Sequence, residues 1–179
     1  MERIQLKDKQ FELFITEAEL SDAIGVMAAR LKTDIASMNP LFIGILNGAF
    51  MFIADLMRHL NGPYELAFAR YFSYQGTGST GQLQEVMPVC ADVRGRQLIL
   101  LEDIVDSGYT MHSLKAKFKA DGAAEVKVAT MLFKPTALEY DARPDYTAME
   151  IPNDFIVGHG LDYNGMGRAY RDIYRIVTN

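Results

Sequence analysis

Thirteen residues near the middle of the chain, LILLEDIVDSGYT (Leu98–Thr110), contain the side chains best suited to chemistry. An apolar run ends in Glu102 and Asp103, and a third acid, Asp106, opens a turn of small and hydroxyl-bearing residues. Such a turn lets backbone N–H groups approach a phosphate at the start of a helix. Glu102 and Asp103 can accept hydrogen bonds from ribose hydroxyls or bind magnesium, which prefers oxygen ligands. Alone, the acid pair is most typical of a solvated turn, but the complete pattern predicts a site for a phosphorylated sugar.

The same segment resembles the signature of the phosphoribosyltransferase family, in which four apolar residues, two acids and two apolar residues precede Asp-Ser/Thr-Gly-x-Thr. Further segments, from about residue 10 to about residue 177, resemble the hypoxanthine-guanine branch of that family. The resemblance implies an α/β protein with the type I phosphoribosyltransferase fold, a parallel sheet flanked by helices with a small hood lobe. It also implies a magnesium-dependent transfer of phosphoribosyl from phosphoribosyl pyrophosphate to hypoxanthine or guanine, with these small molecules as partners.

The resemblance places the phosphoribosyl donor beside the carboxyl end of this strand. Its ribose hydroxyls would lie near Glu102 and Asp103, and its 5-phosphate would lie in the turn formed by Asp106, Ser107, Gly108, Tyr109 and Thr110. Asp106 is the implied general base, since the attacking purine nitrogen must lose a proton that a nearby carboxylate can accept. Glu102, Asp103 and Asp162 are the implied ligands for magnesium.

Two other loops resemble those that hold the leaving pyrophosphate in the family. Leu46-Asn47-Gly48 matches a loop whose backbone amides bind pyrophosphate and that often contains a cis peptide. Ser73-Tyr74, in a stretch rich in Gly, Ser and Thr, matches a mobile lid, and Arg168 matches a pyrophosphate contact. Many relatives have lysine in place of Asn47, and the segment Pro135 to Leu138 lacks a further basic residue of some members, so the leaving-group side has less positive charge here.

The purine would be recognised by residues in two further segments. Lys134 matches the lysine that donates to the exocyclic oxygen of 6-oxopurines, although a lysine at a strand end is more often only solvated. Phe155 matches the aromatic residue that stacks on the base. From its position alone, Phe155 could equally well be an ordinary core aromatic. Ile156 would present its backbone to the edge of the purine. His159 replaces an aromatic residue of the family and is interpreted as a tolerated variant.

The order of the elements is consistent with a parallel sheet that positions these loops. Thr16 to Glu19 reads as a capping box before an amphipathic helix, and LFIGIL (Leu41–Leu46) reads as a strand followed by a helix over 49–60. A second strand over 97–101 precedes a helix over about 110–120, and a third strand covers 125–133. Ligands are expected beyond the carboxyl ends of parallel strands, where the loops after Leu46, Leu101, Phe133 and Val157 would converge.

Length and composition limit the remaining choices. The chain has 179 residues, 49% of them hydrophobic, without repeats or linkers, which predicts a single domain over 1–179 with at most a small appended lobe. A formal charge of −5 disfavours a nucleic-acid binder, and no segment is apolar enough for a signal peptide or membrane span. We therefore expect a soluble cytoplasmic protein with no membrane partner. Cys90, the single cysteine, is expected to be a buried strand thiol. A homodimer or homotetramer is expected from the related enzymes.

Three alternatives remain open at the level of sequence. An RNA-binding, nucleotide-sensing regulator of the same fold is disfavoured by the acidic charge and by the absence of a Lys/Arg run. An aspartate-nucleophile phosphotransferase using Asp103 or Asp106 would not explain the adjoining Ser-Gly-Tyr-Thr turn. A xanthine-preferring enzyme is the nearest competitor, because base preference depends on a few contacts around Lys134 and Ile156.

Overall fold

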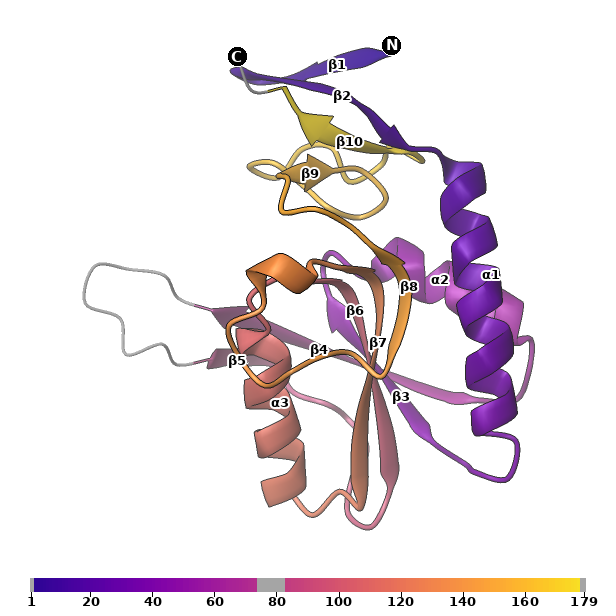
Figure 1. Ribbon diagram of the computed structural model, residues 1–179. Coiled ribbons are helices and arrows are strands. Elements are labelled where there is room, and N and C mark those ends of the chain that lie inside the picture. The colour runs from indigo at the N-terminus through magenta and orange to yellow at the C-terminus, as the bar shows by residue number, and fades with distance from the viewer. Residues whose placement is uncertain (1, 74–82, 178–179) are drawn as a thin grey trace.

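The computed structural model describes residues 2–73 and 83–177, and its body is a sheet of mostly parallel strands (Figure 1). The strands lie in the order β5 (Leu83–Met87), β4 (Glu65–Ser73), β3 (Leu41–Leu46), β6 (Gln97–Val105), β7 (Glu125–Phe133) and β8 (Tyr146–Glu150). All neighbours pair in parallel except β5, which pairs antiparallel with β4. The parallel α/β arrangement expected from the sequence is therefore confirmed.

Helices cover both faces of this sheet. Helices α1 (Glu17–Asp34) and α2 (Phe50–Leu60) lie on one face, and α3 (Tyr109–Ala120) lies on the other (Figure 1). Leu20, Ile24 and Leu31 of α1 are buried in one hydrophobic cluster, whereas Leu114 and Phe118 of α3 belong to a second cluster. The capping box is present, because the Thr16 side chain accepts from the Glu19 amide and the Glu19 carboxylate accepts from the Thr16 amide.

A small antiparallel sheet, which we call the hood, lies above the carboxyl ends of the parallel strands (Figure 1). Its strands lie in the order β1 (Arg3–Leu6), β2 (Lys9–Ile15), β10 (Ile173–Ile176) and β9 (Ile156–Val157). Segments near the two ends of the chain therefore build the hood together, around a core of Leu6, Phe11, Val157 and Tyr174. Between the body and the hood, a short 3-10 helix, η1 (Pro135–Ala137), follows β7.

Two local expectations differ from the structure. Strand β6 does not end at Leu101 but continues to Val105, because Glu102, Ile104 and Val105 still pair with β7, although the pairing with β3 ends at Leu101. Cys90 is exposed in an irregular segment and is not a buried strand thiol. The segment leaves the sheet at Pro88, directly after β5 ends, which is consistent with the missing N–H of proline.

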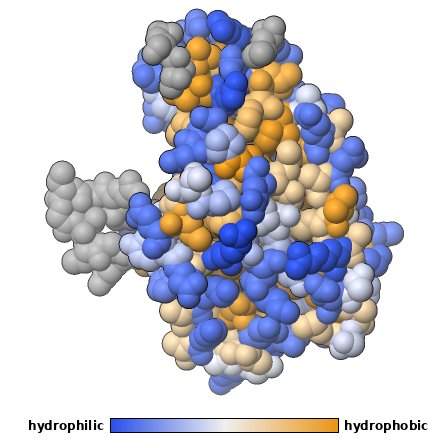
Figure 2. Space-filling model, viewed as in Figure 1, coloured by the Kyte–Doolittle hydropathy of each residue, from blue (hydrophilic) through white to orange (hydrophobic). Residues whose placement is uncertain are grey.

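The surface mixes hydrophilic and hydrophobic residues. In the view of Figure 2, hydrophobic side chains gather where the hood meets the body, and hydrophilic ones predominate over the lower body. No helix among residues 2–73 and 83–177 combines the length and apolar character that a membrane crossing requires.

Candidate active site

A cavity of about 470 Å³ lies between the hood and the carboxyl ends of β3, β6 and β7. Predicted residues from four separate segments line it: Leu46, Asn47 and Gly48; Glu102, Asp103, Asp106 and Thr110; Lys134; and Phe155, Ile156, Asp162 and Arg168. The predicted convergence of loops is thus confirmed. An adjoining cavity of about 360 Å³ is lined by Ser107, Gly108 and Tyr109 and shares Asp106 and Thr110 with the first.

The turn between β6 and α3 has the form of an anion site. Gly108 precedes α3 with a φ of 85°, a left-handed conformation that glycine adopts without a steric penalty. No side chain caps the start of α3, and its first turn contains no acidic residue. Since the first N–H groups of a helix lack partners within the helix and attract negative charge, a phosphate fits this position.

Asp106 and Lys134 form an ion pair inside the cavity. The last residues of two paired strands, Val105 and Phe133, lie side by side, so the residues that follow them are neighbours. Nζ of Lys134 donates to Oδ2 of Asp106 at 2.9 Å. The lysine side chain is 7% exposed and the aspartate side chain is 52% exposed, so the carboxylate faces the cavity while the lysine is held beneath it. The sequence did not predict this contact.

Glu102, which is buried, and Asp103, which is half-buried, form an acidic pair near the end of β6. Burial, followed by the neighbouring Asp103 carboxylate, raises the pKa of Glu102 well above its usual range. Burial also raises the pKa of Asp103, although Arg168 opposes the shift. The nearby positive charge is therefore too small to compensate for the burial of these two carboxylates, and a bound cation would stabilise their ionised forms.

Magnesium fits this set of oxygen donors. No group of three or more His, Cys, Asp or Glu suited to a metal ion occurs in the described part of the chain. Magnesium, however, usually binds through one or two carboxylates together with water and substrate phosphates. The larger cavity contains four carboxylates and two cationic side chains, a formal balance of −2 when all are charged. A polyanionic ligand would consequently need a cation beside it.

The loop 46–48 lies directly against this acidic pair. The Leu46–Asn47 peptide is cis, which agrees with the cis peptide that the family resemblance implies is common in this loop. A Cβ at Gly48 would meet the carboxylate of Asp103 as it is placed here, so glycine lets the loop and this carboxylate lie close together. The loop and the carboxylates of β6 line the same cavity.

Phe155, directly before β9, and the loop between β9 and β10 supply the upper wall of the cavity. Phe155 is 47% exposed, so it is not an ordinary core residue, and its ring packs edge-on against Tyr163. Arg168 pairs with Asp162 at 2.6 Å and also donates to the Gly160 carbonyl at 2.6 Å. Asp162 further accepts from the Gly165 amide at 2.7 Å. The loop therefore holds the Asp162 carboxylate and the Arg168 guanidinium next to each other.

Some residues that line the cavity were not predicted, and one predicted segment lies outside the residues that the structure describes. Tyr71, Phe72, Ile104 and Leu161 also line the cavity, although no chemical signal in the sequence distinguishes them from core residues. Ser73 is the last residue of β4, and Tyr74, with the expected lid over 74–82, lies outside the described residues.

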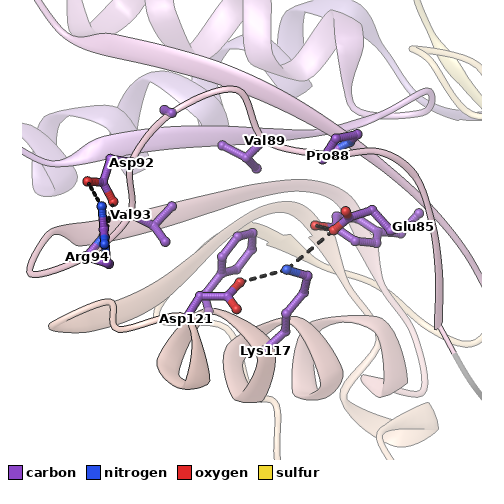
Figure 3. Close-up of a pocket in the computed structure, with 11 residues that line it drawn as sticks. Glu85, Pro88, Val89, Asp92, Val93, Arg94, Lys117 and Asp121 are labelled. Atoms are coloured by element: carbon purple, nitrogen blue, oxygen red, sulfur yellow. Dashed lines mark hydrogen bonds and ion pairs between the residues drawn. The ribbon is translucent and has the colours of Figure 1, made fainter.

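A second cavity, of about 450 Å³, lies between the β4–β5 hairpin and the far half of α3 (Figure 3). Its charged side chains pair with each other: Lys117 lies 2.7 Å from Asp121 and 3.5 Å from Glu85, and Arg94 lies 2.9 Å from Asp92. The Tyr71 hydroxyl donates to Glu85 at 2.9 Å. The three carboxylates and two cationic side chains of the second cavity give a formal balance of −1, against −2 for the first, and its cations are paired with its own acids.

Comparison with known proteins identifies relatives along most of the chain. Residues 12–164 match the family model described as the phosphoribosyl transferase domain. The hypoxanthine-guanine phosphoribosyltransferase of Streptococcus pneumoniae is 39% identical over 153 residues, covering 85% of each chain. That of Bacillus subtilis is 35% identical over 163 residues, covering 90% of this chain and 89% of the relative. A crystal structure of a hypoxanthine phosphoribosyltransferase from Staphylococcus aureus superposes with a TM-score of 0.87 at 28% identity, covering 93% and 91%.

Proposed function

The chain belongs to the phosphoribosyltransferase family, and on that premise we propose that it joins hypoxanthine or guanine to phosphoribosyl pyrophosphate in purine salvage. Its fold is the type I phosphoribosyltransferase fold, a parallel α/β sheet with a hood. The observation that supports the function best is one cavity lined by the β6–α3 turn, Lys134 and Phe155. We also propose that 1–179 acts as one domain, because both end segments of the chain contribute strands to the hood.

The donor would bind along the β6 side of the cavity. The 5-phosphate would accept hydrogen bonds from the N–H groups at the start of α3, and Ser107 and Thr110 would add their hydroxyls. The ribose hydroxyls would donate to Glu102 and Asp103. The pyrophosphate would lie against the backbone of 46–48 and near Arg168, whose planar guanidinium suits a phosphate.

Asp106 would act as the general base. The purine ring nitrogen attacks the anomeric carbon, the bond from that carbon to the pyrophosphate oxygen breaks, and pyrophosphate leaves with the electron pair. The proton on the purine passes to the carboxylate of Asp106, which is more than half exposed to the cavity. Positive charge that develops on the sugar ring is stabilised by the carboxylates at the end of β6.

Magnesium is the proposed cofactor. Glu102, Asp103 and Asp162 would hold it together with the donor, and when bound it would offset the negative charge of the leaving group. Arg168 already pairs with Asp162, so it is placed to share that task.

Lys134 and Phe155 would recognise the purine. The lysine ammonium carries three donors, so one N–H can face a 6-oxo group while another remains bonded to Asp106 at 2.9 Å. Adenine would place an amino group there, leaving two donors facing each other, which disfavours its binding. The exposed Phe155 ring would stack on the base.

We further propose that the chain self-associates as a dimer or tetramer. An apolar hollow lined by Leu46, Phe50 and Phe68 lies beside the active site, and both aromatic rings are at least 40% exposed. A second copy of the chain would remove this surface from water. Light scattering after size-exclusion chromatography should give a multiple of 20.1 kDa, and Phe68→Glu should shift the protein toward monomer.

The function is tested by incubating the protein with phosphoribosyl pyrophosphate, magnesium and one base at a time. Hypoxanthine and guanine should yield nucleoside monophosphate and pyrophosphate, and removal of magnesium by a chelator should stop the reaction. Xanthine is the informative competitor, since a higher kcat/KM with xanthine would reassign the base preference. Turnover of adenine or uracil alone would refute the proposal.

A further inference from the structure

His159 is a buried polar residue to which the proposed reaction gives no role. It lies in the loop between β9 and β10, midway between Ile156 and Asp162, both of which line the active-site cavity. The residue is 2% exposed, so its ring is removed from water. Burying a polar ring without partners is unfavourable, and the groups that surround it therefore indicate what it does.

Both ring nitrogens of His159 face oxygen atoms that can accept a hydrogen bond but have no hydrogen to donate. Nδ1 lies 3.0 Å from the backbone carbonyl oxygen of Arg171, and Nε2 lies 3.0 Å from Oδ2 of Asp55. Because a carbonyl cannot donate, Nδ1 contacts the Arg171 oxygen favourably only as an N–H. Nε2 lies close to the Asp55 carboxylate but does not have hydrogen-bond geometry, so Asp55 is its nearest polar contact without a formed hydrogen bond.

Asp55 belongs to α2, the helix that directly follows the loop 46–48. Its carboxylate also pairs with Arg58 at 2.7 Å, so it is held from one side by its own helix and from the other by His159. The backbone beside His159 reaches the same loop, because a Cβ at Gly160 would collide with the carbonyl oxygen of Gly48. The ring thus connects the wall of the purine subsite to the helix behind the pyrophosphate subsite.

We propose that His159 is a positioning residue that fixes the purine loop, residues 155–162, on helix α2 and so sets the distance between the purine and the donor. This inference rests on the proposed function. The histidine touches no substrate in this role. A misplacement of about 1 Å between reacting groups can cost a hundredfold in rate, so loosening of this contact should lower kcat more than it alters the KM for the donor.

The choice of variants separates the two contacts of the ring. His159→Phe keeps an aromatic ring and removes both polar contacts, so we expect kcat to fall about tenfold or more with donor KM changed less than about threefold. His159→Gln can still extend an N–H toward Asp55 and should restore kcat to within about threefold of the unmodified chain. His159→Asn, with a shorter amide, can reach only the Arg171 carbonyl and should behave like His159→Phe.

Asp55→Asn and the double variant test whether the effect passes through this pair. Asp55→Asn should lower kcat like His159→Phe, and the double variant His159→Phe/Asp55→Asn should be no worse than the larger single loss within about twofold. Arg58→Gln is the matched control, since it removes the other partner of Asp55 on the same helix and should leave kcat unchanged. Equal kcat for His159→Phe, Asp55→Asn and the unmodified chain would overturn the inference, as would additive losses.

Amide hydrogen exchange provides a readout that does not need activity. The amides of Gly158, Gly160 and Leu161 are bonded within this loop and to its neighbours, and they should exchange about tenfold faster in His159→Phe than in Arg58→Gln. Unchanged exchange would refute the inference even if the unmodified chain formed no nucleotide. Inactivity of the unmodified chain with every base would instead refute the proposed function.

Discussion

Replacement of Asp106 by asparagine should separate the chemistry of the site from its structure. Asparagine keeps the size of the side chain and an oxygen that can accept from Lys134, which now lies 2.9 Å away. It cannot accept the purine proton at neutral pH. A positioned general base contributes about 10²–10⁴-fold in rate, so kcat should fall by at least about a hundredfold, or roughly 2.7 kcal/mol in activation free energy.

The free energy of unfolding should change little in the same variant. The Asp106 side chain is 52% exposed, and asparagine still offers an oxygen to the buried Lys134 ammonium, so we expect a loss of about 1 kcal/mol. For a chain of this length, a loss of 1 kcal/mol shifts Tm by roughly 2–4 °C. A variant with a hundredfold lower kcat and a Tm within a few degrees of the unmodified chain would therefore support the base.

Initial rates at saturating donor, together with thermal unfolding, measure both quantities. Asp121→Asn is the matched control, because Asp121 also pairs with a lysine, Lys117, at 2.7 Å but lies at the second cavity (Figure 3). The control should retain full activity. If Asp106→Asn turned over hypoxanthine as fast as the unmodified chain, Asp106 would not be the base, and equal losses in both variants would indicate a general effect of lost charge.

Three further predictions concern neighbouring side chains. Lys134→Gln should lower kcat/KM for hypoxanthine about tenfold to a hundredfold, since a charged hydrogen bond is worth about 1.5–3 kcal/mol, and an unchanged value in initial-rate assays would remove Lys134 from base recognition. Phe155→Ala should raise the KM for guanine by about fivefold or more, the equivalent of about 1 kcal/mol of stacking, while the donor KM stays constant; a selective rise in the donor KM would contradict the assignment. Glu102→Gln should abolish activity and yet stabilise the metal-free protein relative to the unmodified chain. Burial raises the pKa of Glu102, so ionisation of this side chain is unfavourable in the folded state. The stabilising effect of the variant should therefore grow as pH rises above about 4.5, the ordinary pKa of glutamate. Melting curves at pH 5 and pH 8 in a chelator should show the larger difference at pH 8, and a larger difference at pH 5 would show that the sign is wrong.

The fold could be predicted from the sequence because its elements have clear local signals. Apolar runs, a capping box and turn residues gave β3, α1 and β7 nearly to the residue. The end of β6 was set four residues too early, since acids are poor strand formers and Glu102 and Asp103 resemble a turn. Tertiary context overrides that preference, because β7 continues to pair with β6 as far as Val105.

The identities of the site residues could be predicted, but the contacts between them could not. The family resemblance placed Asp106 and Lys134 in one site, yet their ion pair depends on the register of β6 against β7. The contact between His159 and Asp55 joins residues 104 positions apart in the hood and the body, and no spacing in the sequence indicates it. Surface exposure of Cys90 likewise depends on how the chain leaves β5.

A crystal structure of the protein with guanosine 5′-monophosphate would show where the phosphate binds. We expect phosphate oxygens about 2.7–3.2 Å from N–H groups of residues 107–110, with the purine between Phe155 and Lys134. A phosphate bound instead beside Lys117 in the second cavity, or a 107–110 turn that makes no contact with the nucleotide, would contradict this expectation.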